Sequence, residues 1–132
     1  MTEIVPSATP ETLPILYRDE RIVVVDKPSG LLVHRSPIDR HETRFALQIL
    51  RDQLGQRVYT IHRLDKGTSG ALAFGLDPDT AREYGAIFAQ RGVLKTYVAL
   101  VRGWPAVAGT ADRPLPAVED ERAGPHSTQP RE

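Results

Sequence analysis

Short runs of β-branched and apolar residues, each bounded by turn residues, constrain the fold of this chain more than any other feature. ILY at 15–17 and RIVVVD at 21–26 are separated only by the turn-forming residues RDE, which is typical of two strands joined by a tight turn. RVYTI at 57–61 and GALAFGL at 70–76 have the same character, and LKTYVALVRG at 94–103 alternates apolar and polar side chains. We therefore predict a strand over each of these ranges.

Two further segments have the spacing of amphipathic helices. HETRFALQILRDQLG at 41–55 places apolar residues three and four positions apart and ends at a glycine, which stops a helix. A second helix is predicted from Asp77 and Pro78, a suitable N-cap and first-turn proline, to about Arg91, with Gly92 as its stop. The side chains that this second helix is expected to bury are Ala81, Tyr84, Ile87 and Phe88. Strands joined by short turns, with only two helices, indicate an α+β fold with a mixed, largely antiparallel sheet.

The length of 132 residues allows one domain with a modest core. We expect 14–104 to be the folded region, because 1–13 is polar and rich in Pro and Thr, and 105–132 contains five prolines and few large apolar residues. Both ends are predicted to be disordered. No apolar run approaches the roughly 20 residues that span a bilayer, so no membrane partner is expected. The absence of cysteine excludes disulfides and thiol catalysis and is compatible with the cytoplasmic location that we expect.

The net charge of zero conceals an uneven distribution of charge. Residues 14–104 contain 14 Lys and Arg against 10 Asp and Glu, and within 27–66 the numbers are 8 and 4. A basic patch of this kind can bind phosphate groups. A solvated, Arg-rich surface has the same composition, so the charge pattern alone leaves both interpretations open.

The densest polar cluster, IHRLDKGTSG at 61–70, lies directly between two predicted strands. Loops at strand ends commonly carry function on a rigid scaffold, and the neighbouring arginine and lysine would favour the ionised form of Asp65. An ionised carboxylate can act as a nucleophile or as a base. The structural alternative is a turn aspartate that accepts hydrogen bonds from the backbone amides of Thr68 and Ser69.

Several other chemistries are excluded by spacing. The four histidines form no closely spaced pair of the kind that binds a metal, and no cysteine assists them, so no metal site is expected. The sequence has neither the Gly-x-Ser-x-Gly elbow of serine hydrolases nor the Gly-Lys-Ser/Thr loop that binds nucleotide phosphates. KPSG at 27–30 lacks the glycine spacing of a phosphate loop and is predicted to be a turn.

Four segments, taken in order, resemble the motifs of the RluA-type pseudouridine synthases, the family that carries an HRLD signature. HRLDKGTSG at 62–70 is similar to the catalytic motif, and DKPSGLLVH at 26–34 is similar to the first motif. SGALAFGL at 69–76 is similar to the strand that follows the catalytic aspartate, and KTYVALVRG at 95–103 to the motif that supplies a lysine and a tyrosine. The segments around the first two motifs are most similar to the tRNA pseudouridine synthase C branch, and the resemblance spans about 14–104.

This resemblance implies the N-terminal part of a pseudouridine synthase catalytic domain, which isomerises a uridine in RNA without a cofactor or a metal. It favours tRNA over ribosomal RNA as the partner. Asp65 would be the catalytic carboxylate, Arg63 would fill the vacated base stack or hold phosphate, and Tyr97 would lie against the flipped base. Whether Asp65 attacks the sugar, attacks the ring or removes a sugar proton is left open by the motif.

The resemblance also assigns supporting roles around Asp65. The candidates for binding RNA phosphates are Lys27, Arg35 and Lys66, for which simple solvation is the alternative. The residues expected to shape the loop that presents Asp65 are His62, Thr68, Ser69 and Gly70. For Gly70 we expect the lack of a Cβ to allow a close approach of the backbone.

The family pattern includes a later motif of the type G-R-x-H-Q-I-R, whose arginine pairs with the catalytic carboxylate. Nothing of that form follows Gly103, and we therefore expect a truncated member of the family. Three hypotheses follow: an RNA-modifying isomerase or its front part, a non-catalytic RNA-binding module, and a fragment with no native role or one that works only with a complementary chain. The sequence predicts no oligomeric state.

Overall fold

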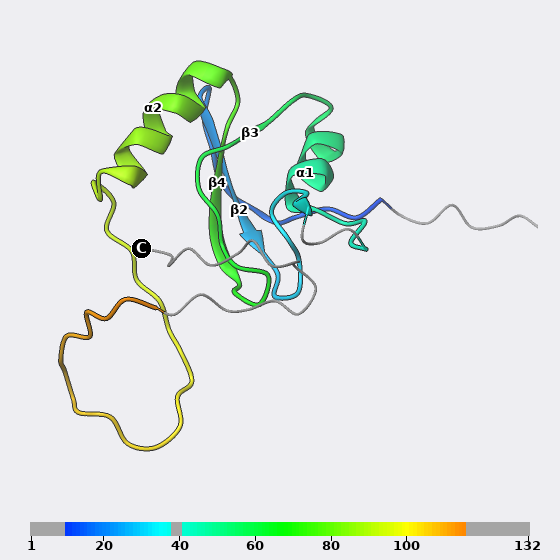
Figure 1. Ribbon diagram of the computed structural model, residues 1–132. Coiled ribbons are helices and arrows are strands. Elements are labelled where there is room, and N and C mark those ends of the chain that lie inside the picture. The colour runs from blue at the N-terminus through cyan, green and yellow to red at the C-terminus, as the bar shows by residue number, and fades with distance from the viewer. Residues whose placement is uncertain (1–9, 38–40, 116–132) are drawn as a thin grey trace, which may run out of the picture. The chain divides into compact units, whose positions relative to one another are not determined.

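The computed structural model of the chain describes residues 10–37 and 41–115. The chain divides into two compact units, 1–94 and 95–132. The helices and strands of the described residues belong to the first unit, and in chain order they are β1 (Ile15–Arg18), β2 (Ile22–Lys27), α1 (Ala46–Leu54), β3 (Tyr59–Thr60), β4 (Gly70–Gly75) and α2 (Pro78–Ala89) (Figure 1). None of the described helices is long and apolar enough to cross a membrane.

The folded unit includes Leu13, which belongs to a segment predicted to be disordered. Its side chain is buried. Its backbone N–H donates to Gln53 Oε1 at 2.8 Å, and Gln53 Nε2 donates to its carbonyl at 3.0 Å. The chain is therefore already fixed to α1 at Leu13, whereas most of the two predicted tails, 1–9 and 116–132, lies outside the described residues.

The sheet contains four strands in the order β1-β2-β4-β3, and each neighbouring pair is antiparallel. β2 and β4 form its centre, with Val25 opposite Leu72. The predicted α+β fold with two helices is confirmed. Parallel pairing among the described residues is limited to an isolated bridge between Leu32 and Phe45, so the sheet itself is antiparallel rather than mixed.

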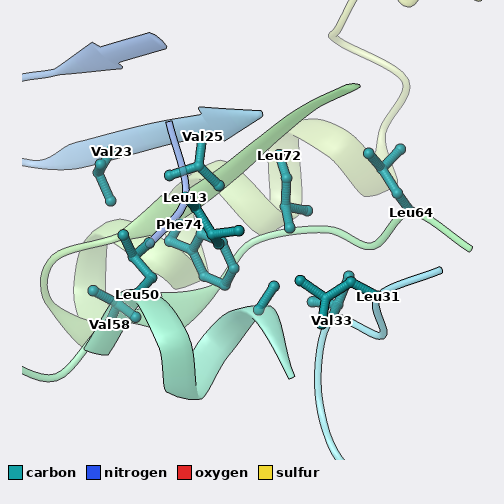
Figure 2. Close-up of a cluster of buried hydrophobic side chains, with 11 residues drawn as sticks. Leu13, Val23, Val25, Leu31, Val33, Leu50, Val58, Leu64, Leu72 and Phe74 are labelled. Carbon is teal, nitrogen blue, oxygen red and sulfur yellow. The ribbon is translucent and has the colours of Figure 1, made fainter. Parts of the chain in front are cut away.

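One face of the sheet carries the hydrophobic core. Alternate residues of a strand point to the same face, so Val23 and Val25 of β2 lie with Leu72 and Phe74 of β4 on the face that α1 covers (Figure 2). The buried members of this cluster are Leu13, Val23, Val25, Leu31, Val33, Ala46, Leu50, Val58, Leu64, Leu72 and Phe74. Because the loops that follow β2 and β3 contribute to it, the same core holds both loops against the sheet.

α1 begins several residues later than predicted and ends as predicted. The backbone amides of Ala46 and Leu47 donate to the carbonyls of Leu32 and Val33 at 2.8 and 2.9 Å. The first amides of a helix have no partner within the helix, so the loop after β2 satisfies them and no earlier helical turn is needed. Gly55, in the left-handed conformation with a φ of 66°, ends the helix.

α2 covers the opposite face of the sheet from α1 (Figure 1). A Cβ at Gly75 of β4 would lie 2.9 Å from the backbone nitrogen of Ala81, so only glycine allows the helix to approach β4 this closely. The predicted N-cap is confirmed. The carboxylate of Asp77 accepts hydrogen bonds from the backbone amide and the hydroxyl of Thr80, both at 2.7 Å.

The end of α2 differs from the prediction. Arg91, rather than Gly92, takes the left-handed conformation, with a φ of 58°. The amide of Gly92 reaches back to the carbonyl of Ile87 at 2.8 Å, which is the hydrogen bond of a Schellman-type helix end. Of the side chains expected to be buried, Ala81, Tyr84 and Phe88 are half-buried and Ile87 is exposed, whereas the buried residue of the helix is Thr80.

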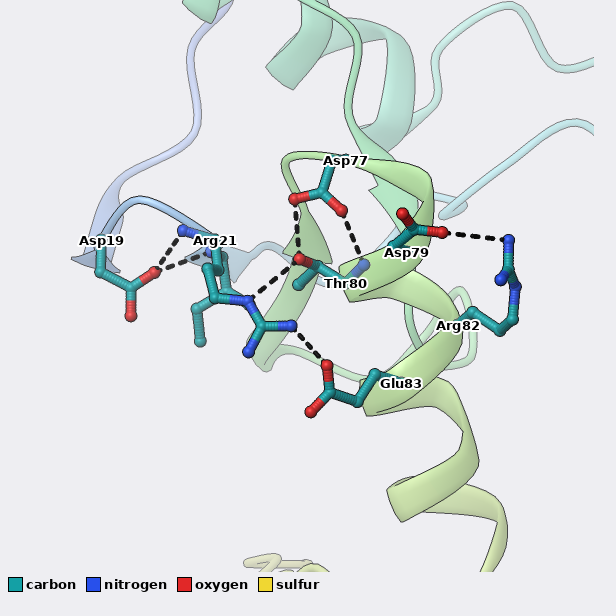
Figure 3. A network of polar contacts seen from close by, with 8 residues as sticks. Asp19, Arg21, Asp77, Asp79, Thr80, Arg82 and Glu83 are labelled. Carbon is teal, nitrogen blue, oxygen red and sulfur yellow. Dashed lines mark hydrogen bonds and ion pairs between the residues drawn. The ribbon is translucent and has the colours of Figure 1, made fainter.

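A polar network joins the turn between β1 and β2 to the start of α2 (Figure 3). Asp19 Oδ1 accepts a hydrogen bond from the amide of Arg21 at 2.7 Å. The guanidinium of Arg21 donates to the hydroxyl of Thr80 at 3.3 Å and forms an ion pair with Glu83. Because Thr80 also binds Asp77, one residue fixes both the helix cap and the turn.

The strand predicted over 94–103 is not formed. All of these residues are described, and none belongs to a strand. Val98 and Leu100 are fully exposed. An alternating sequence becomes a strand only where a neighbouring strand binds its amides, and none of the described strands pairs with this segment.

A buried ammonium group joins the loop after β2 to the loop after β3. Lys27 is 0 % exposed, and its Nζ donates to the carbonyls of Leu31, Pro28 and Lys66 at 2.6, 3.0 and 3.1 Å. The amide of Gly30 donates to the same Lys66 carbonyl at 2.7 Å. A lysine ammonium has three donors, so all of them are used. We call Lys27, Gly30 and the carbonyls that they bind the Lys27 clamp.

Leu72→Ala should lower the free energy of unfolding by about 2–5 kcal/mol, because it removes a fully buried side chain and leaves a cavity. The matched change Leu16→Ala on the edge strand should cost about 0.5 kcal/mol or less, since Leu16 is 56 % exposed. Urea unfolding followed by circular dichroism measures both. Equal losses for the two variants would contradict the assignment of the core face.

Asp77→Asn should reduce the acid sensitivity of the fold. Hydrogen bonds from the Thr80 amide and hydroxyl hold the pKa of Asp77 below its ordinary value. Its stabilising contribution is therefore complete above the ordinary aspartate pKa and is lost as the pH falls through the lower, folded value. Asparagine retains a capping oxygen but does not titrate. Melting temperatures measured from about pH 6 to about pH 2 should fall less steeply for Asp77→Asn than for the unmodified chain, and equally steep curves would be evidence against the cap.

Lys27→Met should lower the free energy of unfolding by roughly 1–3 kcal/mol, because the buried carbonyl of Leu31 and the partly buried carbonyls of Pro28 and Lys66 lose a donor. Lys66→Met is the matched control, since it removes a surface ion pair with Glu42 that should contribute at most about 1 kcal/mol. Chemical denaturation of both variants provides the comparison. A Lys27→Met variant as stable as the unmodified chain would show that the clamp does not hold the loops.

Candidate active site

The loop between β3 and β4 alternates buried and exposed residues. Ile61 and Leu64 are buried, whereas Arg63 and Asp65 are exposed. Leu64 belongs to the core cluster. The burial of Leu64 therefore fixes the loop at the residue immediately before Asp65, while the carboxylate itself remains accessible.

Asp65 opens a tight turn that is closed by the backbone. Its carbonyl accepts a hydrogen bond from the amide of Thr68 at 3.0 Å. The alternative in which the carboxylate accepts from the amides of Thr68 and Ser69 is not what the structure shows, because the Thr68 amide binds the main-chain oxygen instead. Within the described part of the chain no hydrogen bond to the Asp65 carboxylate is found. Its oxygens are thus available to a ligand.

A hydrogen bond joins this turn to the loop that follows β2. The hydroxyl of Ser29 donates to the carbonyl of Gly67 at 2.8 Å, next to the Lys66 carbonyl of the Lys27 clamp. Burial lowers the pKa of Lys27, and the negative charge of Asp65 acts in the opposite direction. The buried ammonium and the Asp65 carboxylate therefore attract each other where the two loops meet.

The geometry corrects the role predicted for Lys27. An ammonium that is buried and bound to three carbonyls does not offer itself to an RNA phosphate, so Lys27 positions the loop instead. Lys66 differs, because its side chain is half exposed and pairs with Glu42 on the surface. A phosphate group could bind Lys66 by displacing Glu42. No pattern in the sequence indicates this pair, because its members are 24 positions apart.

The remaining cations predicted to bind RNA lie on the surface. The guanidinium of Arg35 lies 5.3 Å from the centre of the Phe45 ring, at the start of α1, in a cation–π contact. This contact orients Arg35 and leaves it exposed. Arg63 is also exposed, two residues before Asp65. Both side chains remain candidates for phosphate contacts.

The ring of His62 is held between β4 and α2. Its Nε2 accepts a hydrogen bond from the backbone amide of Ala73 at 3.0 Å. The ring stacks on Phe88 of α2, with the ring centres 4.2 Å apart and the planes 10° apart. The expected loop-ordering role thereby acquires a structural basis, although Phe88 was expected only as a core residue.

Gly70 serves a different purpose from the one predicted. A Cβ at this position would meet no atom within 4 Å, so close approach of the backbone is not the reason for glycine. Its φ of 129° is the reason, because residues with a side chain rarely adopt it. Thr68 is half-buried and contributes its amide to the turn, and Ser69 is exposed.

Tyr97 belongs to the second compact unit, 95–132, where its side chain is 60 % exposed. Its position against a flipped base stays a prediction. The exposure is that of a side chain able to contact a ligand, as an aromatic stacking platform must be.

The chemistry that this site offers is that of an accessible carboxylate on an anchored turn. The described residues contain no group of three or more histidines and carboxylates that could hold a metal ion. With a buried cation near it, Asp65 can attack an electrophilic carbon or remove a proton.

The chain is similar to known proteins over most of its length. A family model described as RNA pseudouridylate synthase matches residues 21–131, which include both clamped loops. The chain is 48 % identical over 120 residues to the tRNA pseudouridine synthase C of Vibrio cholerae, covering 91 % of this chain and 49 % of that protein. It is 49 % identical over 119 residues to the tRNA pseudouridine synthase C of Haemophilus ducreyi, covering 90 % of this chain and 49 % of that protein.

The chain is also similar to the solved structure of a protein whose name refers to a pseudouridylate synthase domain. Human RNA Pseudouridylate Synthase Domain Containing 4 matches with a TM-score of 0.50 and 29 % identity, over 60 % of this chain and 30 % of that one. The chain spans about half the length of the curated relatives it matches. The family match extends over most of the sequence, and the chain belongs to the RNA pseudouridylate synthase family.

Proposed function

We propose that this chain supplies the catalytic carboxylate, Asp65, of an enzyme that converts a uridine of tRNA into pseudouridine. The observation that carries the proposal is the state of that carboxylate. It is exposed, it accepts no hydrogen bond from the described residues, and it is fixed between the buried Leu64 and the Lys27 clamp. A cytoplasmic location is part of the same proposal.

The reaction is an isomerisation and needs no redox partner. The bond between the uracil nitrogen N1 and the ribose carbon C1′ breaks, the base turns, and a bond forms between C1′ and the uracil carbon C5. The proton on C5 is released and N1 gains one, so atoms and electrons balance. An ionised Asp65 supports this either by attacking the sugar or the ring, or by removing a sugar proton.

The target uridine must leave its base stack before Asp65 can reach it. Flipping a base costs a few kcal/mol, and stacking on an aromatic side chain returns about 1–3 kcal/mol. Tyr97 is the proposed platform, and the planar cation of Arg63 is the group proposed to fill the vacated stack. Arg35 and Lys66 are the proposed phosphate contacts, with Lys66 exchanging its partner Glu42 for the RNA.

Asp65→Asn should abolish pseudouridine formation while RNA binding remains, because the substitution removes the reactive charge and almost preserves the shape. Release of tritium from C5-labelled uracil in tRNA measures the reaction, and a filter-binding assay measures affinity. Asp52→Asn on the exposed surface of α1 is the matched control and should keep both activities.

Full tritium release by Asp65→Asn would overturn the proposal. RNA binding by the unmodified chain without any release would instead support the second candidate, an RNA-binding module.

A further inference from the structure

The pairing between β3 and β4 stops after two residues, although β4 itself continues. Tyr59 pairs with Gly75 and Thr60 with Phe74. On its other edge, β4 remains paired with β2 as far as Gly70. The chain after Thr60 therefore leaves the sheet while its neighbouring strand goes on.

Beyond the last pair, Thr60 and Phe74, the amide of Ala73 in β4 binds a side chain instead of a carbonyl of β3. The N–H of Ala73 donates to Nε2 of His62 at 3.0 Å. A buried or half-buried amide without a partner would cost free energy. The imidazole takes the place of a main-chain carbonyl, so the β3 segment can turn away from β4 without leaving this amide unpaired.

The acceptor role defines the protonation state of His62. A backbone N–H can only donate, so Nε2 must present its lone pair, and in the neutral ring the proton is on Nδ1. The ring is fixed in its plane by the stack on Phe88 at 4.2 Å. Because α2 packs on β4 through Gly75 and Ala81, the plane of the ring is set by the helix and the sheet together.

We propose that His62 is a positioning residue for Asp65. By ending the β3–β4 ladder at Thr60 and binding Ala73, the neutral imidazole determines where the chain departs from the sheet. Leu64 then enters the core, and Asp65 emerges three residues after His62. This inference rests on the proposed function for its catalytic meaning, but the hydrogen bond and the protonation state are independent of it.

Nuclear magnetic resonance of the unmodified chain tests the protonation state directly. With ¹⁵N labelling, the imidazole shifts of His62 at neutral pH should show the proton on Nδ1. A scalar coupling should link Nε2 to the amide nitrogen of Ala73 across the hydrogen bond. A proton on Nε2, or a charged ring, would overturn the proposal, and this result does not depend on any variant folding.

Two substitutions separate the acceptor from the stack. His62→Phe keeps the aromatic stack and removes the acceptor, so the exchange rate of the Ala73 amide with solvent should rise by about tenfold. His62→Gln retains an acceptor and should restore part of the protection. His41→Phe, at an exposed histidine, is the matched control and should leave the Ala73 amide unchanged.

Steady-state kinetics of the same variants with tRNA as substrate measures the effect of His62 on catalysis. For His62→Phe, kcat should fall by roughly tenfold or more, because a small displacement of a reacting group is costly, while KM stays within about twofold. His62→Gln should recover part of kcat. Unchanged kcat together with unchanged Ala73 exchange in His62→Phe would overturn the inference. If the unmodified chain forms no pseudouridine, the proposed function fails, and the resonance and exchange measurements still decide the role of His62.

Discussion

The buried ammonium of Lys27 is the interaction on which the arrangement of this site depends. It ends β2, and it binds carbonyls of both the loop that follows β2 and the loop that carries Asp65. These loops are 39 positions apart in sequence at the Lys27–Lys66 contact. Without this donor, the two loops would be joined only by the hydrogen bonds from the Gly30 amide and the Ser29 hydroxyl to the carbonyls of Lys66 and Gly67.

Burying the ammonium group of Lys27 costs free energy, and the groups around it offset that cost. Burial disfavours its charged form, and three carbonyl acceptors at 2.6–3.1 Å replace the lost water. The charge of Asp65 compensates further, because the pair attract one another. The same ammonium therefore binds both loops and attracts the carboxylate to which the chemistry is assigned.

Local sequence patterns were sufficient to predict those elements whose conformation depends on residues close by in the sequence. The strands at β1, β2 and β4, the Asp77 cap and the end of α1 at Gly55 follow from side-chain alternation, capping chemistry and glycine conformation. The segment at 94–103 shows the limit, since its alternation is real but a strand also requires a partner, which no pattern within the segment can supply. Arg91 shows a second limit of prediction from local patterns, because an arginine adopts the left-handed conformation at the end of α2, where a glycine would be expected.

In the site, too, the sequence predicted the residues that belong to a local motif and not the contacts between residues far apart in the chain. The HRLD resemblance singled out Asp65 and Arg63, and the comparisons show the family. The sequence could not show that Lys27 is buried, because an isolated lysine is ordinarily exposed. Nor could it show that Glu42 pairs with Lys66 or that Phe88 supports His62, because these contacts come from tertiary packing.

Hydrogen exchange at the amide of Gly30 tests the clamp most directly. This amide lies in an exposed turn, and its protection depends on its hydrogen bond to the Lys66 carbonyl at 2.7 Å. If the two loops form one rigid junction, the Gly30 amide should exchange about as slowly as the amides in the centre of β2. Exchange at the rate of an unprotected amide, with β2 still protected, would contradict the account.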